Sequence, residues 1–266
     1  MIVDTHAHLD SAEFAPDLPQ VLSEAQSAGI EWIVCPGTSA HSSRQVIELA
    51  SRYGIIAPAV GIHPNYAGEA DPVDWKTIEK LADLPQVVAI GETGLDRHWD
   101  FTPWSVQEEY FDRHLWLAGK KDLPVIVHCR EAEADVLRHL QEAQRQHRII
   151  GVVHAYSSPP ELAQAVVGMG FYVSFAGSLT YRNKKFDPLR AAVGVVPTDR
   201  LLVETDSPYL VPEPYRGKLK RNRPALIVET LRYLARLVKL EYEHVCRITT
   251  ESALRLFRLS SVRSSI

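Results

Sequence analysis

Two histidines, His6 and His8, stand one residue apart just after the β-branched residues Ile2 and Val3. Because side chains alternate between the two faces of a β-strand, both imidazoles are expected to point the same way. Two imidazoles that converge on one point can chelate a divalent metal ion. A polar strand end that meets solvent would show the same short pattern, so the pair needs further ligands elsewhere in the chain.

Further polar residues follow other apolar segments at the points where strands should end. Four histidines and two carboxylates exceed what one tetrahedral ion needs, and they suit two divalent ions about 3.5–4 Å apart. A bidentate carboxylate can bridge such a pair, and Glu92 is the expected bridge. Asp206 is predicted to contact both an ion and the attacking water, which makes it the candidate general base. We expect the first ion at His6, His8, Glu92 and Asp206, and the second at Glu92, His128 and His154.

The elements that must position these residues alternate along the chain. Eight short apolar segments, beginning at residues 2, 30, 55, 87, 124, 149, 171 and 201, are separated by amphipathic helical patterns. Continuously apolar segments are typical of parallel strands buried on both faces. The sequence therefore predicts an α/β fold, a single (β/α)8 TIM-type barrel over residues 1–258 with its catalytic groups at the carboxyl ends of the strands. Extra C-terminal helices are expected in ALIVETLRYLARLV and YEHVCRITTESALRLF, followed by a short flexible tail at 259–266.

Composition limits the classes of partner. The formal net charge of −4 over 266 residues provides no global basic field for nucleic acid. Cys35, Cys129 and Cys246 are widely spaced and form no CxxC motif, which argues against a disulfide framework or a thiolate zinc site. The sequence has neither a bilayer-spanning apolar segment nor the pattern of a signal peptide. We therefore expect a cytoplasmic monomer with no membrane contact and no obligate protein partner.

Six ordered blocks resemble the TatD family of metal-dependent hydrolases, within the wider amidohydrolase-like barrels. The blocks are THAHLD, VGIHP, AIGETGLD, PVIVHCRE, GVVHAYSS and LLVETDSPYL, and the similarity extends to about Phe257. This resemblance implies a TIM-type barrel, a divalent metal centre and deoxyribonuclease activity on phosphodiester bonds, typically as a 3′–5′ exonuclease. The resemblance also implies metal-ligand roles for the same six residues, His6, His8, Glu92, His128, His154 and Asp206. It also implies that His63 lies near the scissile phosphate, where it would orient that group or transfer a proton to the leaving oxygen.

Two segments depart from the family's pattern. The chain reads His-Ala-Tyr-Ser-Ser from His154, where the family commonly has His-Cys-Phe-Ser-Gly. The loop from Arg216 to Arg223 is also longer and more basic than usual. Neither departure removes a ligand, but both bear on the choice of substrate. DNA phosphates are predicted to contact Arg130, Arg221 and Arg223. Trp99, Trp104 and Trp116 are expected to be packing residues, and Trp99 is the one of them that could stack a base.

Other functions remain open at this point. The same metal geometry would support hydrolysis of a small ester, lactone or amide. Strand four, however, offers Glu92 where many amidohydrolases use a modified lysine. A non-catalytic, metal-bound nucleic-acid-binding module is the third possibility, and the intact ligand set with a candidate base argues against it. The identity of the two ions is open among zinc, manganese, magnesium, iron and nickel.

Overall fold

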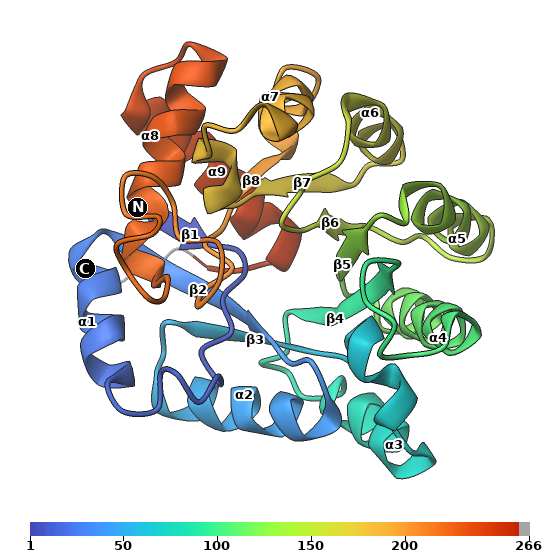
Figure 1. Ribbon diagram of the computed structural model, residues 1–266. Coiled ribbons are helices and arrows are strands. Elements are labelled where there is room, and N and C mark those ends of the chain that lie inside the picture. Colours follow the sequence, from blue (N-terminus) through green and yellow to red (C-terminus); the bar gives the residue numbers. More distant parts are fainter. Residues whose placement is uncertain (261–266) are drawn as a thin grey trace.

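Eight parallel strands form the frame of the computed structural model, which describes residues 1–260 (Figure 1). Each strand pairs with the next one in chain order, because a helix between them returns the chain to the same end of the sheet. All eight strands begin within two residues of their predicted positions. They are β1 (Ile2–Asp4), β2 (Ile30–Pro36), β3 (Ile56–Val60), β4 (Ala89–Asp96), β5 (Val125–Arg130), β6 (Gly151–Val153), β7 (Tyr172–Phe175) and β8 (Leu201–Val203).

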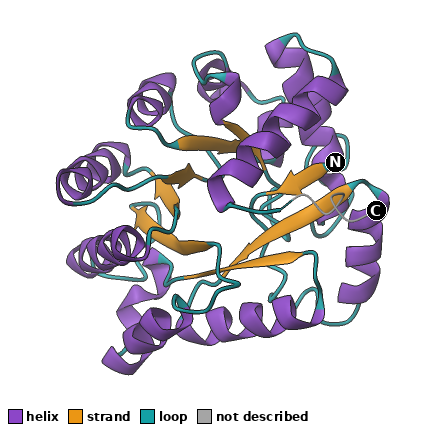
Figure 2. Cartoon of the chain, turned by 180° about the vertical axis from the view of Figure 1, so that it is seen from behind, coloured by secondary structure: helices purple, strands orange, loops and turns teal. Residues whose placement is uncertain are grey.

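Helices surround this sheet on its outer face (Figure 2). Both predicted C-terminal helices are present: α8 completes the eighth strand–helix unit and α9 follows it. None of the helices in the described part of the chain is long and apolar enough to span a bilayer. The helices are α1 (Leu18–Ser27), α2 (Ala40–Arg52), α3 (Pro72–Leu81), α4 (Trp104–Lys121), α5 (Glu133–Gln146), α6 (Pro160–Gly168), α7 (Asp187–Val193), α8 (Ile227–Val238) and α9 (Tyr242–Phe257).

Polar contacts bring the last strand against the first. The Thr5 amide donates to the Val203 carbonyl at 3.2 Å. Beside this bond, the Asp4 carboxylate accepts hydrogen bonds from the Thr205 amide at 2.9 Å and from its hydroxyl at 2.6 Å. Burial raises the pKa of Asp4 to about 8, although these hydrogen bonds act in the opposite direction. Thr205 therefore joins β8 to β1 and faces away from the predicted metal ligands.

The interior of the barrel is a packed core. All eight strands contribute buried side chains to it, among them Val34, Ile126 and Leu202. Helix α9 adds Ala253, Leu256 and Phe257 to the same cluster. This helix lies at the amino ends of the strands, where the Thr250 hydroxyl donates to the Met1 carbonyl at 3.1 Å. The opposite end of the barrel is thus left for the candidate site.

The predicted flexible tail at 259–266 begins with two described residues. Leu259 packs against the interior cluster, and the Trp32 indole donates to the Ser260 carbonyl at 3.0 Å. Residues 261–266 lie outside the described residues. The flexibility expected of this segment stays a prediction.

A buried histidine joins α4 to α5 on the outside of the barrel. His139 Nδ1 lies 2.6 Å from Asp112 Oδ1, and its Nε2 lies 3.2 Å from Glu108 Oε1. Burial lowers the pKa of His139, but the two carboxylates outweigh it and raise this pKa above its ordinary value. Because the folded pKa exceeds the unfolded one, the stabilisation is complete below about pH 6.5 and is lost as pH rises through the folded pKa.

Replacement of His139 by glutamine is therefore expected to destabilise the protein more at about pH 6 than at about pH 9. The free energy of unfolding, measured by urea denaturation at both pH values, checks this. His244→Gln is the matched control, because His244 lies exposed on α9. Equal losses at both pH values in the His139 variant would show that its charge does not stabilise the fold.

Candidate metal centre

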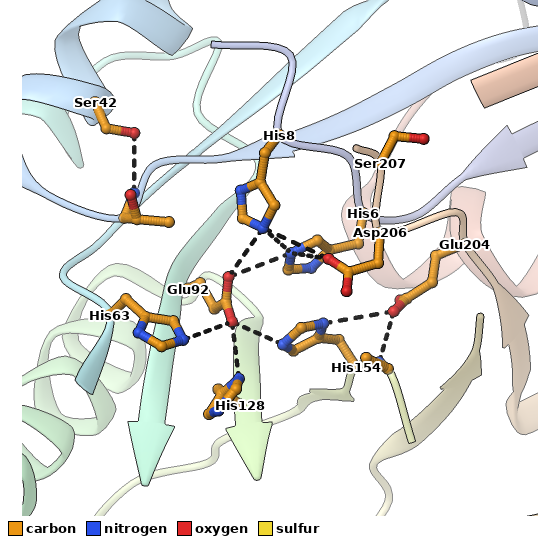
Figure 3. A network of polar contacts seen from close by, with 12 residues as sticks. His6, His8, Ser42, His63, Glu92, His128, His154, Glu204, Asp206 and Ser207 are labelled. Carbon is orange, nitrogen blue, oxygen red and sulfur yellow. Dashed lines mark hydrogen bonds and ion pairs between the residues drawn. The ribbon is translucent and has the colours of Figure 1, made fainter. Parts of the chain in front are cut away.

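The structure brings all six predicted ligands together at the carboxyl ends of the strands (Figure 3). Parallel strands place these ends on one face of a barrel, so residues far apart in the sequence meet there. The side chain of Glu92 lies in the middle of the group, with the histidines around it (Figure 3). His6 and His8 follow β1, Glu92 belongs to β4, His128 belongs to β5, His154 follows β6 and Asp206 follows β8.

The two carboxylate oxygens of Glu92 face two different sets of histidines. Oε2 lies 3.3 Å from His6 Nε2 and 3.4 Å from His8 Nε2. Oε1 lies 2.8 Å from His154 Nε2 and 3.0 Å from His128 Nδ1. Burial by itself would raise the pKa of Glu92, but the surrounding histidines lower it well below its ordinary value. Glu92 is therefore a carboxylate with one oxygen available to each side.

Asp206 reaches the first of these sets from a turn after β8. Its Oδ1 lies 3.8 Å from His6 Nε2 and 3.6 Å from His8 Nε2. Its φ of +53° is left-handed, a conformation that a non-glycine residue keeps only when its surroundings impose it. Here the Asp206 amide donates to the His6 carbonyl at 2.9 Å, and the Tyr209 amide donates to the Asp206 carbonyl at 2.8 Å. These two bonds hold the turn that directs the carboxylate toward the histidines.

The donor atoms of this cluster fit divalent metal ions. His6 Nε2 and His8 Nε2 lie 3.1 Å apart and face the same carboxylates. Within the described residues, Glu92 Oε2 is buried without a hydrogen-bond partner. Buried lone pairs of this kind are costly unless a proton or a cation satisfies them. Over residues 1–260, three groups have ligand atoms within 4.8 Å of one another: His6, His8 and Asp206; His6, Glu92 and His154; and His63, Glu92 and His128.

His63 joins the cluster in a different chemical state. It precedes the short 3-10 helix η1 (Pro64–Glu69), and its Nδ1 accepts a hydrogen bond from the Asn65 amide at 3.1 Å. An accepting Nδ1 is unprotonated, so the neutral ring carries its proton on Nε2. This Nε2 lies 3.2 Å from Glu92 Oε1. His63 therefore presents a hydrogen-bond donor to the centre of the cluster.

Sequence reasoning missed Asp96, which holds His128 in place. Asp96 Oδ2 lies 3.0 Å from His128 Nε2. With a metal ion bound at Nδ1, this nitrogen would carry the proton and donate it to the Asp96 carboxylate. Burial raises the pKa of Asp96, but the hydrogen bond and charge of His128 lower it to about 2. The available signal was spacing, since Asp96 comes four residues after Glu92 in the same strand.

Glu204 was also missed, and it lies beside His154 (Figure 3). Its Oε1 accepts a hydrogen bond from the Ala155 amide at 2.6 Å and lies 3.4 Å from His154 Nδ1. Glu204 is fully buried. With a metal ion bound at Nε2, a carboxylate in this position would hold the proton on Nδ1. Its position directly after β8, two residues before Asp206, was the available signal.

A cavity of about 910 Å³ opens above the cluster, and Arg130 lines it. Arg221 and Arg223 are not among the described residues that line it. Arg221 forms an ion pair with Asp17, and Arg223 Nη1 lies 2.7 Å from Glu24 Oε2. These ion pairs hold the loop after β8 against the beginning and the body of α1. Phosphate contact by Arg221 and Arg223 stays a prediction, and it would require exchange of these carboxylate partners.

Comparison with known proteins gives consistent matches along the chain. The model of a family described as TatD related DNase matches residues 3–258. The chain is 38% identical over 260 residues to the uncharacterized metal-dependent hydrolase YabD of Bacillus subtilis, covering 98% of this chain and 100% of that protein. It is 31% identical over 258 residues to the 3′–5′ ssDNA/RNA exonuclease TatD of Salmonella typhimurium, covering 96% and 98%. The crystal structure of YjjV, a TatD homologue from Escherichia coli K12, has a TM-score of 0.90 at 29% identity, covering 97% and 98%.

Proposed function

The chain belongs to the TatD family of metal-dependent hydrolases, and on this premise we propose that it cleaves phosphodiester bonds of DNA as a 3′–5′ exodeoxyribonuclease. The observation that carries the proposal is Glu92, whose two oxygens face two sets of histidines. A bridged pair of ions suits in-line displacement at phosphorus. The relative from Salmonella typhimurium, named as an exonuclease on single-stranded DNA and RNA, supports this class of substrate.

The proposal divides the ligands between two ions. One would be held by His6, His8, Asp206 and Glu92 Oε2, and the other by His128 Nδ1, His154 Nε2 and Glu92 Oε1. When bound, two divalent ions of zinc, manganese, magnesium, iron or nickel supply Lewis-acid charge to the phosphate and make water more acidic.

Asp206 and His63 are proposed to act on the water and on the phosphate, Asp206 in addition to its place among the ligands. The Asp206 carboxylate accepts a proton from the attacking water as the new phosphorus–oxygen bond forms. The bond from phosphorus to the 3′ oxygen of the neighbouring nucleotide breaks, and this leaving oxygen takes its proton from solvent water. His63 directs its Nε2–H at a phosphate oxygen. Its Nδ1 is already occupied by the Asn65 amide, so a neutral ring that orients the phosphate fits better than an acid that protonates the leaving oxygen.

The surroundings of the cluster support a few local phosphate contacts. Arg130 and Lys185 are the lysine and arginine side chains among the described residues that line the cavity. With a net charge of −4, the chain has no excess of positive charge for a long basic track. We further propose that the protein acts as a monomer, because one chain supplies every member of the cluster. A reducing compartment such as the cytoplasm fits its three free, buried cysteines.

Metal removal tests the proposed function directly. The purified protein, loaded with a divalent ion, should shorten a 5′-labelled single-stranded oligonucleotide stepwise from its 3′ end. A chelator should stop the reaction and added metal should restore it. An oligonucleotide with 3′-terminal phosphorothioate linkages is the matched control and should resist. If metal-loaded protein left every oligonucleotide intact but hydrolysed a small ester or lactone, the nuclease proposal would be wrong.

A further inference from the structure

Two aromatic rings stack in the open at the wall of the cavity. Trp99 and Phe101 lie in the loop between β4 and α4, with ring centroids 5.3 Å apart and an interplanar angle of 9°. Both line the cavity, yet Trp99 is 43% exposed and Phe101 is 65% exposed. Single exposed apolar side chains need no explanation, but a stacked pair at a binding cavity can be extended by a planar ligand on an outer ring face.

This pair is fixed to the metal centre through one carboxylate. Asp96 Oδ2 contacts the ring of His128 at 3.0 Å. The other oxygen, Oδ1, accepts hydrogen bonds from the amides of His98 at 2.8 Å and Trp99 at 3.1 Å. Any displacement of the Trp99 turn would therefore disturb the contact between Asp96 and His128, a predicted metal ligand. The stacked rings are held at a set position relative to the site of cleavage.

A second anchor holds the first residue of the same loop. The Arg97 guanidinium lies 3.7 Å from the Trp104 ring centroid, at the start of α4. Its Nη2 also lies 2.7 Å from Asp135 Oδ2 on α5. With both contacts in place, the loop is preorganised, and binding a ligand to its rings costs less conformational entropy.

Arg130 adds a positive charge to the aromatic pair. It stands at the end of β5, two residues after His128, and its guanidinium carbon lies 5.8 Å from the Trp99 ring centroid. The side chain is exposed. A flat apolar surface beside a guanidinium matches the two parts of a nucleotide, its planar base and its anionic phosphate.

We propose that Trp99, Phe101 and Arg130 form a stacking platform for an unpaired nucleobase next to the scissile phosphate. The inference rests on the proposed nuclease function and adds a source of strand selectivity to it. A base inside a duplex is stacked and paired, so it must leave the helix before it can lie on this platform. A base at a single-stranded end meets no such barrier. The platform therefore favours single-stranded ends over paired ones.

The test combines protein variants with a change in the substrate. Trp99→Ala is compared with Trp116→Ala, because Trp116 is equally exposed, at 42%, and has Lys120 Nζ 4.5 Å from its ring, but lies on α4 outside the residues that line the cavity. Phe101→Ala is a second variant, at a side chain that is mostly exposed. Each metal-loaded protein is assayed on two single-stranded oligonucleotides that differ only by an abasic residue next to the first scissile phosphate.

On the intact oligonucleotide, Trp99→Ala should lower kcat/KM by about 5- to 150-fold, the worth of one base–aromatic stack, mostly through KM. Trp116→Ala should behave as the wild type. On the abasic oligonucleotide, the wild type should lose a similar factor, and Trp99→Ala should lose little more.

Two results would overturn the platform. One is a Trp99→Ala or Phe101→Ala variant that cleaves the intact oligonucleotide as well as Trp116→Ala does. The other is a Trp99→Ala loss of the same size on both oligonucleotides, which would mean that the residue acts through something other than the base. In both cases the nuclease function would stand. A wild type that cleaves neither oligonucleotide would refute the nuclease function and the platform together.

Discussion

Glu92→Gln is expected to reduce turnover nearly to background and to lower the amount of metal that the protein retains. A glutamine side chain has the same size but only one oxygen acceptor, and its NH2 group would point at imidazole nitrogens that now face a carboxylate oxygen. The distances from Glu92 to His6, His8, His128 and His154 range from 2.8 to 3.4 Å, so the substitution alters the contacts on both sides of the carboxylate. Metal content after dialysis and the rate of oligonucleotide shortening measure the two effects.

Glu251→Gln is the matched control, because Glu251 lies exposed on α9 at the far end of the barrel. It should keep both the metal and the rate. The bridging role of Glu92 would be refuted by a Glu92→Gln protein that retains full metal occupancy and full activity. If Glu92→Gln lost activity but kept full metal occupancy, Glu92 would act on the substrate and would not be needed to hold the ions.

Asp206→Asn is expected to lower the turnover rate by about 10²–10⁴-fold, the usual worth of general base catalysis. The amide keeps an oxygen that can coordinate a metal ion, but it cannot accept a proton from water. Metal occupancy should therefore fall far less than the rate does. Measurement of kcat and metal content on the same preparation separates the two.

Asp199→Asn provides the comparison for this variant. Asp199 lies just before β8, at the opposite end of the same strand, and its side chain is 59% exposed. It should leave the rate unchanged. Substantial activity in a metal-loaded Asp206→Asn protein would show that another group removes the proton from the attacking water.

The frame and the centre of the site could be predicted because both depend on local sequence. Each strand is a short apolar segment, and a parallel strand buried on both faces leaves little choice of pattern. Each predicted ligand stands where such a segment ends, so the strands fix its position without knowledge of side-chain contacts.

Contacts between distant segments could not be predicted in the same way. The arginines at 221 and 223 belong to a basic loop that resembles a phosphate-binding segment. Their acidic partners, Asp17 and Glu24, stand 204 and 199 residues earlier, and only the folded chain brings them together. Asp96 and Glu204 could be placed at the carboxyl ends of β4 and β8 by spacing. Which imidazole nitrogen each one contacts depends on side-chain rotamers that sequence does not specify.

The position of α9 has a consequence for how the chain is made. Ala253, Leu256 and Phe257 fill an interior to which all eight strands contribute, yet they are translated after the last strand. At about 5–20 residues per second, the ribosome completes α9 roughly 3–10 s after β8. During that interval all eight strands exist, but the apolar core between them stays open to water at one end. Substitutions that weaken α9 should therefore act first on the nascent chain, as aggregation and low yield, before any effect on the chemistry at the other end of the barrel.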